Sequence, residues 1–554
     1  MQTVKQRLAY PLAVTAVALL LGLAVDWLFY DKALGISLLL FVLLLIGGLF
    51  GLGLLEGKKP EPRNLWLLLP LLFFSLMVAI RANAFVTVLN VLAVLALLTY
   101  LAFFYGNGRV TELGVLGAFL VPVRTGLHSS VLAVPLLAAA LESHHITQRQ
   151  RRLFPVLRGL LLALPLLFVF TLLLTSADLV FAQYVERLLT LDFLPNLDEV
   201  IGRTIIVSVA AWGLAGGLVY ALAWRETAET DKSALENGVQ TLPQQYGLGF
   251  GEAATMLALV NGLFLIFVAV QFTYLFGGER HLNLEGVTYA EYARRGFFEL
   301  VVVAVLTLAL VLALNWITRR SSKRQIRLFN SLSSGLALLV LVMLVSAWQR
   351  MELYETTFGY TELRLYVFAF MAWLAALLLW FLLTLWRSPH RFALGLMVAA
   401  MGYLTTLNLL NPDAFIVRQN LARYAETGDL DAAYLTTLSA DAVPELVAAL
   451  AQVQGDEQPV FMPGCAADRD GSAHASSETA CEATLTEVLL INLRGRYEVM
   501  AEGRRPWQSA HLAHQRAYQQ LQKTFVTSSG GVEAEEKALW LADFGIKPHL
   551  VLRR

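Results

Sequence analysis

Long apolar segments dominate the chain. Hydrophobic stretches recur from residue 8 to residue 410, whereas residues 411–554 are much more polar. Because about 20 apolar residues cross the hydrocarbon core as an α-helix, most of these segments are long enough to span a bilayer. The pattern predicts eleven spans, with 65–80 and 332–348 shorter than the rest, at residues 8–28, 33–55, 65–80, 84–105, 153–174, 204–224, 253–276, 297–317, 332–348, 363–386 and 392–410.

The predicted fold class is all-α. Residues 1–410 are expected to form a polytopic membrane helical bundle, and residues 411–554 an extracytoplasmic α-helical domain. Composition agrees, because 57% of the residues are hydrophobic and only 15% are charged, well outside the usual range of soluble domains. Small residues four apart, at Gly47 and Gly51 and at Gly213 and Gly217, have the spacing that lets helix backbones approach closely.

Residues 113–142 break the pattern of clean spans. Two apolar pieces of about ten residues flank a polar break around Arg124 and His128, and neither piece is long enough to cross alone. One interpretation is a re-entrant hairpin, whose exposed backbone would have to be buried in protein or line a wet cavity. The other is a pair of interfacial helices on the cytoplasmic face, with their basic residues near lipid phosphates.

Orientation follows from Lys and Arg in the loops. When alternate loops are grouped, one side of the bundle carries 19 basic residues, and the other carries far fewer, among them Lys32, Arg81, Arg187, Arg280, Arg294, Arg295 and Arg350. We therefore expect a cytoplasmic N-terminus. An odd number of spans then places the C-terminal domain on the extracytoplasmic side.

The two cysteines both fall in the C-terminal domain. Cys465 and Cys481 flank a Gly-, Ala-, Ser- and Asp-rich loop of fifteen residues. An oxidising compartment would allow them to form a disulfide, which is the prediction. Two unpaired thiols are the alternative.

Helix signals in the C-terminal domain are clear. Asn411 is a good N-cap and Pro412 suits a first helical turn, so a helix should run to about Gly428. Asp429 and Asp441 are expected to start two more helices. Amphipathic helices follow near residues 483–493 and 507–525.

Candidate metal ligands are few. His511 and His514 share a face of the last of these helices, and without a third ligand they are expected to be surface residues. Asp26 and Asp31 could flank a metal in the first outer loop, although a helix-end aspartate is the simpler interpretation of Asp26. No metal or cofactor is predicted, and no catalytic residue is assigned.

Polar residues inside the spans bear on mechanism. The span centres carry no charge, and Asn90, Asn261, Gln271 and Asn408 are the polar residues left inside. Neutral amides more often join helices than move ions. A polar cavity lined by these residues would favour a transporter.

An aromatic and basic segment leads into the eighth span. Its residues, with Gln271 at the preceding helix end, are predicted to form a structural hub at the membrane surface, comprising Gln271, Tyr289, Tyr292, Arg294, Arg295, Phe297 and Phe298. This block resembles the signature of a bacterial polytopic membrane family, Domain of Unknown Function 4173. The resemblance continues in Asn411-Pro-Asp-Ala-Phe-Ile-Val-Arg418-Gln-Asn420 and in the Tyr434 to Leu446 segment. It implies a bacterial inner-membrane location and no established chemistry.

Three functions fit these observations. The leading one is a non-enzymatic scaffold, sensor or assembly subunit in the lipid bilayer, whose residues 411–554 meet a protein partner. The second is a transporter or channel. The third is a lipid-linked glycosyl- or phosphotransferase on the outer face, although the first outer loop is short for such an enzyme. Nothing in the sequence indicates nucleic-acid binding.

Overall fold

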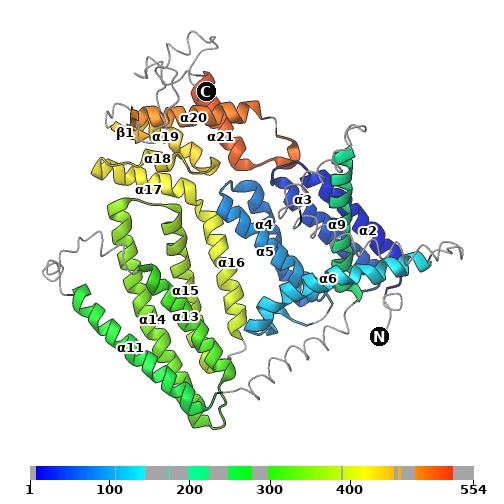
Figure 1. Cartoon of the computed structure of the whole chain (residues 1–554), viewed down its shortest axis with the longest axis horizontal. Helices are drawn as coiled ribbons and strands as arrows, with labels where there is room; N and C mark the ends of the chain where they lie inside the picture. The colour runs from blue at the N-terminus through cyan, green and yellow to red at the C-terminus, as the bar shows by residue number, and fades with distance from the viewer. Residues whose placement is uncertain are drawn as a thin grey trace. The chain divides into compact units, whose positions relative to one another are not determined.

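The computed structural model describes residues 8–106, 108–143, 174, 197–223, 248–276, 297–388, 391–453, 459–462, 481–503 and 505–527. These residues are almost entirely helical, and eleven of the helices are long and apolar enough to cross a membrane. They confirm an all-α polytopic membrane protein (Figure 1). By backbone contacts the chain divides into two compact units, residues 1–76 with 91–239 and residues 77–90 with 240–554.

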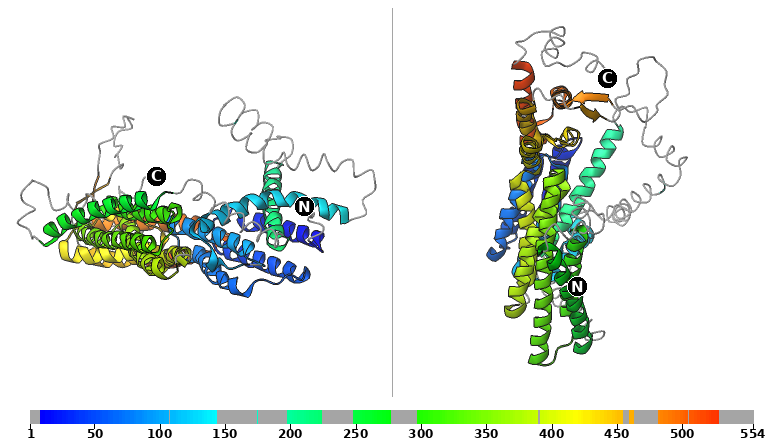
Figure 2. Two further views of the ribbon diagram at one scale, coloured as in Figure 1. Left: turned by 90° about the horizontal axis from the view of Figure 1, so that it is seen from below. Right: turned by 90° about the vertical axis from the view of Figure 1, so that its left-hand side faces the viewer.

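The first unit holds the N-terminal helices. Its helices are α2 (Pro11–Phe29), α3 (Ile36–Leu55), η1 (Pro62–Leu67), η2 (Val110–Glu112), α6 (Val115–Ser143) and α9 (Leu197–Ala223), together with parts of α4 (Leu68–Ile80) and α5 (Ala84–Phe103). In both Figure 1 and the left view of Figure 2, α6 runs crosswise to α9. At their contact a Cβ on Gly216 would fall on the backbone of Ser129, so glycine is required there. Trp212 Nε1 donates to the Ser130 carbonyl at 2.8 Å beside it.

Helix α6 corrects the prediction for residues 113–142. The two apolar pieces form one continuous helix of 29 residues, with Pro122 and Pro135 inside it. A re-entrant hairpin needs a break in the helix, so that prediction was wrong, and a single helix replaces the pair of interfacial helices. The predicted span at 153–174 falls, apart from residue 174, outside the described residues.

At three of the four paired glycines the described residues show no close packing. A Cβ on Gly47, Gly51 or Gly213 would meet no described residue within 4 Å, whereas one on Gly217 would lie 4.0 Å from Ser129 Oγ. The close contacts occur instead at neighbouring glycines such as Gly48, where the Val17 side chain would lie 3.0 Å from the added Cβ.

The second unit contains the remaining membrane helices, α11 (Phe250–Phe276), α13 (Phe297–Ile317), α14 (Lys323–Phe358), α15 (Glu362–Arg387) and α16 (Phe392–Leu410). Helix α14 is much longer than the predicted span at 332–348. Ser322 is its N-cap: the Ser322 hydroxyl accepts from the Gln325 amide, and the Gln325 side chain accepts from the Ser322 amide. At about 1.5 Å per residue its 36 residues exceed the thickness of a hydrocarbon core.

The C-terminal helices lie across the ends of α14 and α15 (Figure 1). They are α17 (Pro412–Thr427), α18 (Ala432–Leu435), η6 (Ala440–Ala442), α19 (Val443–Val453), α20 (Leu485–Glu502), η7 (Trp507–Ser509), α21 (Leu512–Gln522) and η8 (Lys523–Thr527). A two-stranded antiparallel sheet pairs β1 (Pro459–Met462) with β2 (Cys481–Thr484). Ile416, Leu446 and Leu489 are fully buried in a shared core that also includes Leu365 of α15.

Two helix starts in this region differ from prediction. Helix α17 does run from Pro412 to Thr427, with Gly428 at φ +71° after it, but Asn411 has φ +54° and its side chain makes no capping hydrogen bond. Asp431, not Asp429, caps α18 by accepting from the amide of Tyr434. Asp441 lies within η6, which Ser439 caps, and its carboxylate is engaged elsewhere.

Candidate functional site

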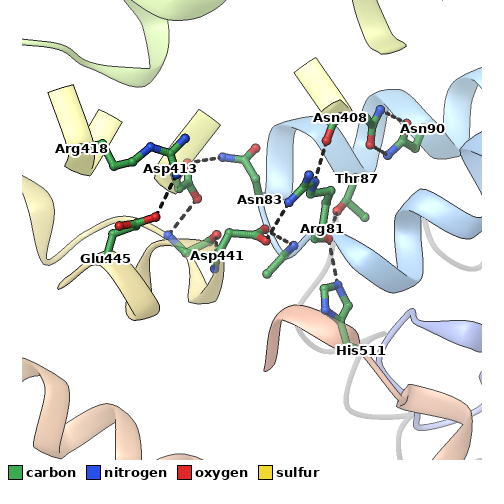
Figure 3. Close-up of polar contacts among 12 residues, drawn as sticks. Arg81, Asn83, Thr87, Asn90, Asn408, Asp413, Arg418, Asp441, Glu445 and His511 are labelled. Carbon is green, nitrogen blue, oxygen red and sulfur yellow. Dashed lines mark hydrogen bonds and ion pairs between the residues drawn. The ribbon is translucent and has the colours of Figure 1, made fainter. Parts of the chain in front are cut away.

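Buried and partly buried polar groups meet where the C-terminal helices contact the turn between α4 and α5. We call this set the junction cluster and define it as Arg81, Asn83, Glu362, Asp413, Asp441, Arg496 and His511, most of which Figure 3 draws. All of these residues belong to the second unit. The cluster brings together segments that lie more than 400 residues apart in the sequence, as in the contact of His511 with Arg81.

Asn83 binds two acidic side chains. Its amide nitrogen lies 2.6 Å from Glu362 Oε1 and 2.9 Å from Asp413 Oδ1. Its amide oxygen accepts from the backbone of Val86 at 3.0 Å, which caps the start of α5. The second oxygen of Asp413 accepts from the amide of Ser439 at 3.1 Å. Asn83 and Asp413 thus join the α4–α5 turn to α15, α17 and the start of η6.

Asp441 holds the other half of the same turn (Figure 3). Its Oδ2 accepts from the amide of Ala82 at 2.5 Å, and its Oδ1 lies 3.6 Å from a guanidinium nitrogen of Arg81. Burial raises the pKa of Asp441, while the Ala82 amide and the Arg81 guanidinium oppose that rise. A buried carboxylate whose two oxygens both have partners is typical of a structural contact between segments and not of a catalytic acid or base.

Arg81 and His511 complete the cluster. Arg81 Nε donates to the Asn408 carbonyl at 2.6 Å, and the Arg81 carbonyl lies 2.8 Å from His511 Nε2. His511 is buried and its ring lies 5.0 Å from that of His514, in an edge-to-face arrangement. Burial and the nearby Arg505 lower the pKa of both rings, that of His514 to about 4. The prediction that these histidines are surface residues was therefore wrong for His511.

Arg496 ties α20 to the same region. Its guanidinium donates to the carbonyls of Thr436 and Leu438 at 2.6 Å each, and to that of Ser439 at 3.2 Å. Burial lowers the pKa of Arg496. Because all three acceptors are backbone carbonyls between α18 and η6, the partly buried guanidinium holds this segment of backbone in place.

The loop between α14 and α15 is held in the same manner. Asn420 accepts from the amide of Tyr360 and donates to its carbonyl, each at 2.9 Å. Gly359 beside it has φ +76°, a conformation that favours glycine. The Tyr434 hydroxyl accepts from the amide of Glu362 at 2.8 Å, and burial raises the pKa of Tyr434 to about 12.

Three of the four amides predicted inside the membrane helices, Asn90, Asn261 and Asn408, are hydrogen-bonded. Asn90 and Asn408 exchange two hydrogen bonds, of 2.9 and 2.8 Å, between α5 and α16 (Figure 3). Asn261 donates to the carbonyls of Leu257 and Leu332 at 2.7 and 3.1 Å. These contacts join helices, as expected of neutral amides in apolar surroundings.

The predicted hub is only partly described. Tyr289, Tyr292, Arg294 and Arg295 lie outside the described residues. Phe297 begins α13, Phe298 is exposed, and Gln271 is buried near the end of α11 with no hydrogen-bond partner for its amide. Cys465 also lies outside the described residues, so the Cys465–Cys481 disulfide stays a prediction.

Asp26 pairs with an arginine. Arg203 of α9 donates from Nε to both Asp26 oxygens at 3.1 Å each, and from Nη2 to Oδ2 at 2.7 Å. This ion pair accounts for the position of Asp26 without a metal. Among the described residues no group of three or more His, Cys, Asp or Glu side chains could hold a metal ion. The junction cluster itself was missed as a site, although its Asp413 and Asp441 lie in the motifs after the last span, as do the neighbouring Asn420 and Tyr434.

Comparison with known families assigns most of the chain. The model of a family described as Domain of unknown function (DUF4153) matches residues 68–449. This supports membership of a family without known activity, but not the specific resemblance to Domain of Unknown Function 4173. No curated protein and no solved structure gives a significant match.

Proposed function

We propose that this chain, which belongs to the family described as Domain of unknown function (DUF4153), is a non-enzymatic component of the bacterial inner membrane whose outer helices dock a protein partner. In this proposal residues 411–554 are an extracytoplasmic helical domain that the junction cluster holds on the ends of the membrane helices. The protein would act as a scaffold, sensor or assembly subunit.

The junction cluster carries the proposal. Both carboxylate oxygens of Asp413 accept hydrogen bonds, from Asn83 and Ser439. Those of Asp441 contact the Ala82 amide and the Arg81 guanidinium. The two carboxylates therefore hold neighbouring segments of the chain together. A buried polar network in which each member has partners makes a rigid joint. A rigid joint suits a domain that must present one surface in a constant orientation.

Charges at the two ends of the second unit support its proposed orientation. One end has a group of basic residues between α13 and the first turns of α14 and at the end of α15, namely Arg319, Arg320, Lys323, Arg324, Arg327, Arg387 and Arg391. The junction end of α14 and α15 carries Arg350 and Arg364. Basic loops face the cytoplasm. The C-terminal helices then lie outside, and this argument does not depend on whether α6 crosses the membrane.

The alternatives have less support among the described residues. A transporter would be favoured by mid-membrane amides that line a path, but Asn90, Asn261 and Asn408 are engaged between helices. A transferase on the outer face would need accessible carboxylates, and Asp26 is held by Arg203.

Co-purification tests the proposal. Protein extracted in a mild detergent from its native host should migrate as a complex larger than the chain alone, with one protein partner retained in constant ratio. The Asp441→Ala variant removes the contacts with Ala82 and Arg81 and should lose that partner. The Glu445→Ala variant removes only the pair with Arg418 and should keep it. Proteoliposomes that contain the protein alone should show the same proton and potassium leak as empty vesicles. A specific ion flux without a partner would instead establish the transporter.

A further inference from the structure

A cavity of about 500 Å³ lies at the basic end of the second unit, where α13 ends and α14 begins. Its polar wall consists of Asn315, Thr318, Arg320 and Asn330, and its apolar wall of Ile326, Leu385 and Trp386. The apolar wall comes from the first turn of α14 and the last turn of α15. A cavity with one polar and one apolar wall, at the level where membrane helices end, is suited to an amphiphile.

The surroundings of the cavity are strongly positive. Residues 312–351 and 363–412 contain no Asp or Glu, and Arg319, Lys323, Arg324 and Arg387 lie close along the chain to the lining residues. Among the described residues at this end of the unit, Glu252 of α11 carries the opposing negative charge. Its carboxylate accepts a hydrogen bond from the amide of Gly249 at 2.8 Å. An anion is therefore favoured at this end of the bundle.

Arg320 is pre-positioned in the polar wall. One terminal nitrogen donates to Asn315 O and Oδ1 at 2.7 and 2.9 Å, and the guanidinium lies 4.4 Å from the centre of the Phe329 ring. Its other nitrogens donate to no described residue. Thr318, which also lines the cavity, is 7% exposed and its hydroxyl has no hydrogen-bond partner. The wall thus holds an oriented cation beside an unsatisfied hydroxyl donor.

We propose that this cavity binds an anionic phospholipid, with its headgroup phosphate on Arg320 and the Thr318 hydroxyl and its acyl chain along Ile326, Leu385 and Trp386. Arginine donates to phosphate through fixed, charge-assisted hydrogen bonds. Trp386 donates its indole N–H to Ser334 at 2.9 Å while its ring stays exposed, as interfacial tryptophans do. Basic pockets between membrane helices on the cytoplasmic side are known to hold anionic headgroups.

Thermal unfolding in detergent with added lipid tests the proposal. Phosphatidylglycerol should raise the Tm of the full chain in a saturable way, whereas phosphatidylcholine and inorganic phosphate at equal concentration should not. Arg320→Gln should weaken phosphatidylglycerol binding about tenfold, because one charge-assisted contact is lost. Arg327→Gln removes the same charge from an exposed position outside the cavity, and should bind like the parent.

A second variant keeps the test valid if Arg320→Gln fails to fold. Thr318→Val removes the hydroxyl at nearly constant volume and should weaken binding by a smaller factor, about threefold. Native mass spectrometry should show one phosphatidylglycerol retained on the parent and on Arg327→Gln, with lower occupancy on both cavity variants and the lowest on Arg320→Gln. Equal losses in Arg320→Gln and Arg327→Gln would reduce the effect to general surface charge and overturn the site. Saturation by inorganic phosphate alone would overturn the lipid as its ligand.

Discussion

His511 Nε2 lies 2.8 Å from the carbonyl oxygen of Arg81, which joins the start of α21 to the turn between two membrane helices. The same turn is held by Asp441 through the amide of Ala82 and by Asp413 through Asn83. Three C-terminal side chains from three different segments therefore converge on residues 81–83. This convergence makes the α4–α5 turn the anchor of the C-terminal helices and leads to the predictions that follow.

Acid should loosen this anchor through the histidines. Burial lowers the pKa of His511, and lowers that of His514 to about 4, so both rings are neutral in the fold near neutral pH. The unfolded chain takes up protons below about pH 6.5, so their contribution to stability is complete above that pH and is lost as the pH falls towards 4. We expect the Tm to fall between pH 7 and pH 5.

Removal of the titrating groups should flatten that pH dependence. The double variant His511→Gln, His514→Gln keeps an amide donor near the Arg81 carbonyl but cannot take up a proton in this range. Its Tm should change less between pH 7 and pH 5 than that of the parent. Asp441 acts in the opposite sense because its pKa is raised, so it cannot produce the loss. An identical slope in both proteins would refute the histidine explanation.

Asp441→Ala should be strongly destabilising. The change leaves the Ala82 amide and the Arg81 guanidinium without their buried acceptor, which typically costs about 3–5 kcal/mol. Asp441→Asn keeps an acceptor and should cost less. Glu445→Ala is the matched control, because its pair with Arg418 is partly exposed to solvent and worth about 0–1 kcal/mol. Denaturant or thermal unfolding of the three variants would measure this order, and equal losses for Asp441→Ala and Glu445→Ala would contradict it.

Asn90 and Asn408 should behave as a coupled pair. Either single change to Leu leaves the other amide without its partner between α5 and α16. The double variant should recover part of the loss, with a coupling energy of about 1 kcal/mol in detergent. Strict additivity of the two single changes would show that the reciprocal hydrogen bonds contribute nothing.

Reporter fusions and cysteine labelling would decide the topology. A reporter after Arg554 should be active outside the cytoplasm, and one near Arg324 inside it. We also predict that α6 lies along the cytoplasmic face, since this keeps Arg109 and Arg149 on the same side and preserves the excess of basic residues there. Single cysteines at these two positions, in a background without Cys465 and Cys481, should be labelled from the same side. Labelling from opposite sides would show that α6 crosses.

The sequence predicts the membrane helices well because burial in lipid acts on every residue of a segment. The long apolar runs of α3, α5 and α16 leave no alternative to a helix, since the backbone must satisfy itself. The long helix α6 was missed because Arg124, His128 and two prolines reduce its hydropathy without breaking its backbone.

The junction cluster depends on contacts that no local pattern encodes. Asp441 follows a helix-start pattern, yet its carboxylate bonds to Ala82, 359 residues away. His511 directly precedes α21 and His514 lies within it, in a segment that is polar by sequence, but His511 contacts the α4–α5 turn through the Arg81 carbonyl. The signal that pointed to this region was the polar motif after the last span, which contains Asp413 and Asn420.

Site-specific photo-crosslinking in living cells tests the central claim most directly. A photoreactive amino acid at Val499 or Trp507, apolar residues of the C-terminal helices that are 65% and 52% exposed, should trap one protein in discrete crosslinked bands. The same group at the exposed polar residue Glu498 serves as the control. The docking account predicts bands at the apolar positions that disappear in the Asp441→Ala background. Crosslinks to lipid alone at all three positions would contradict a docking function for these helices.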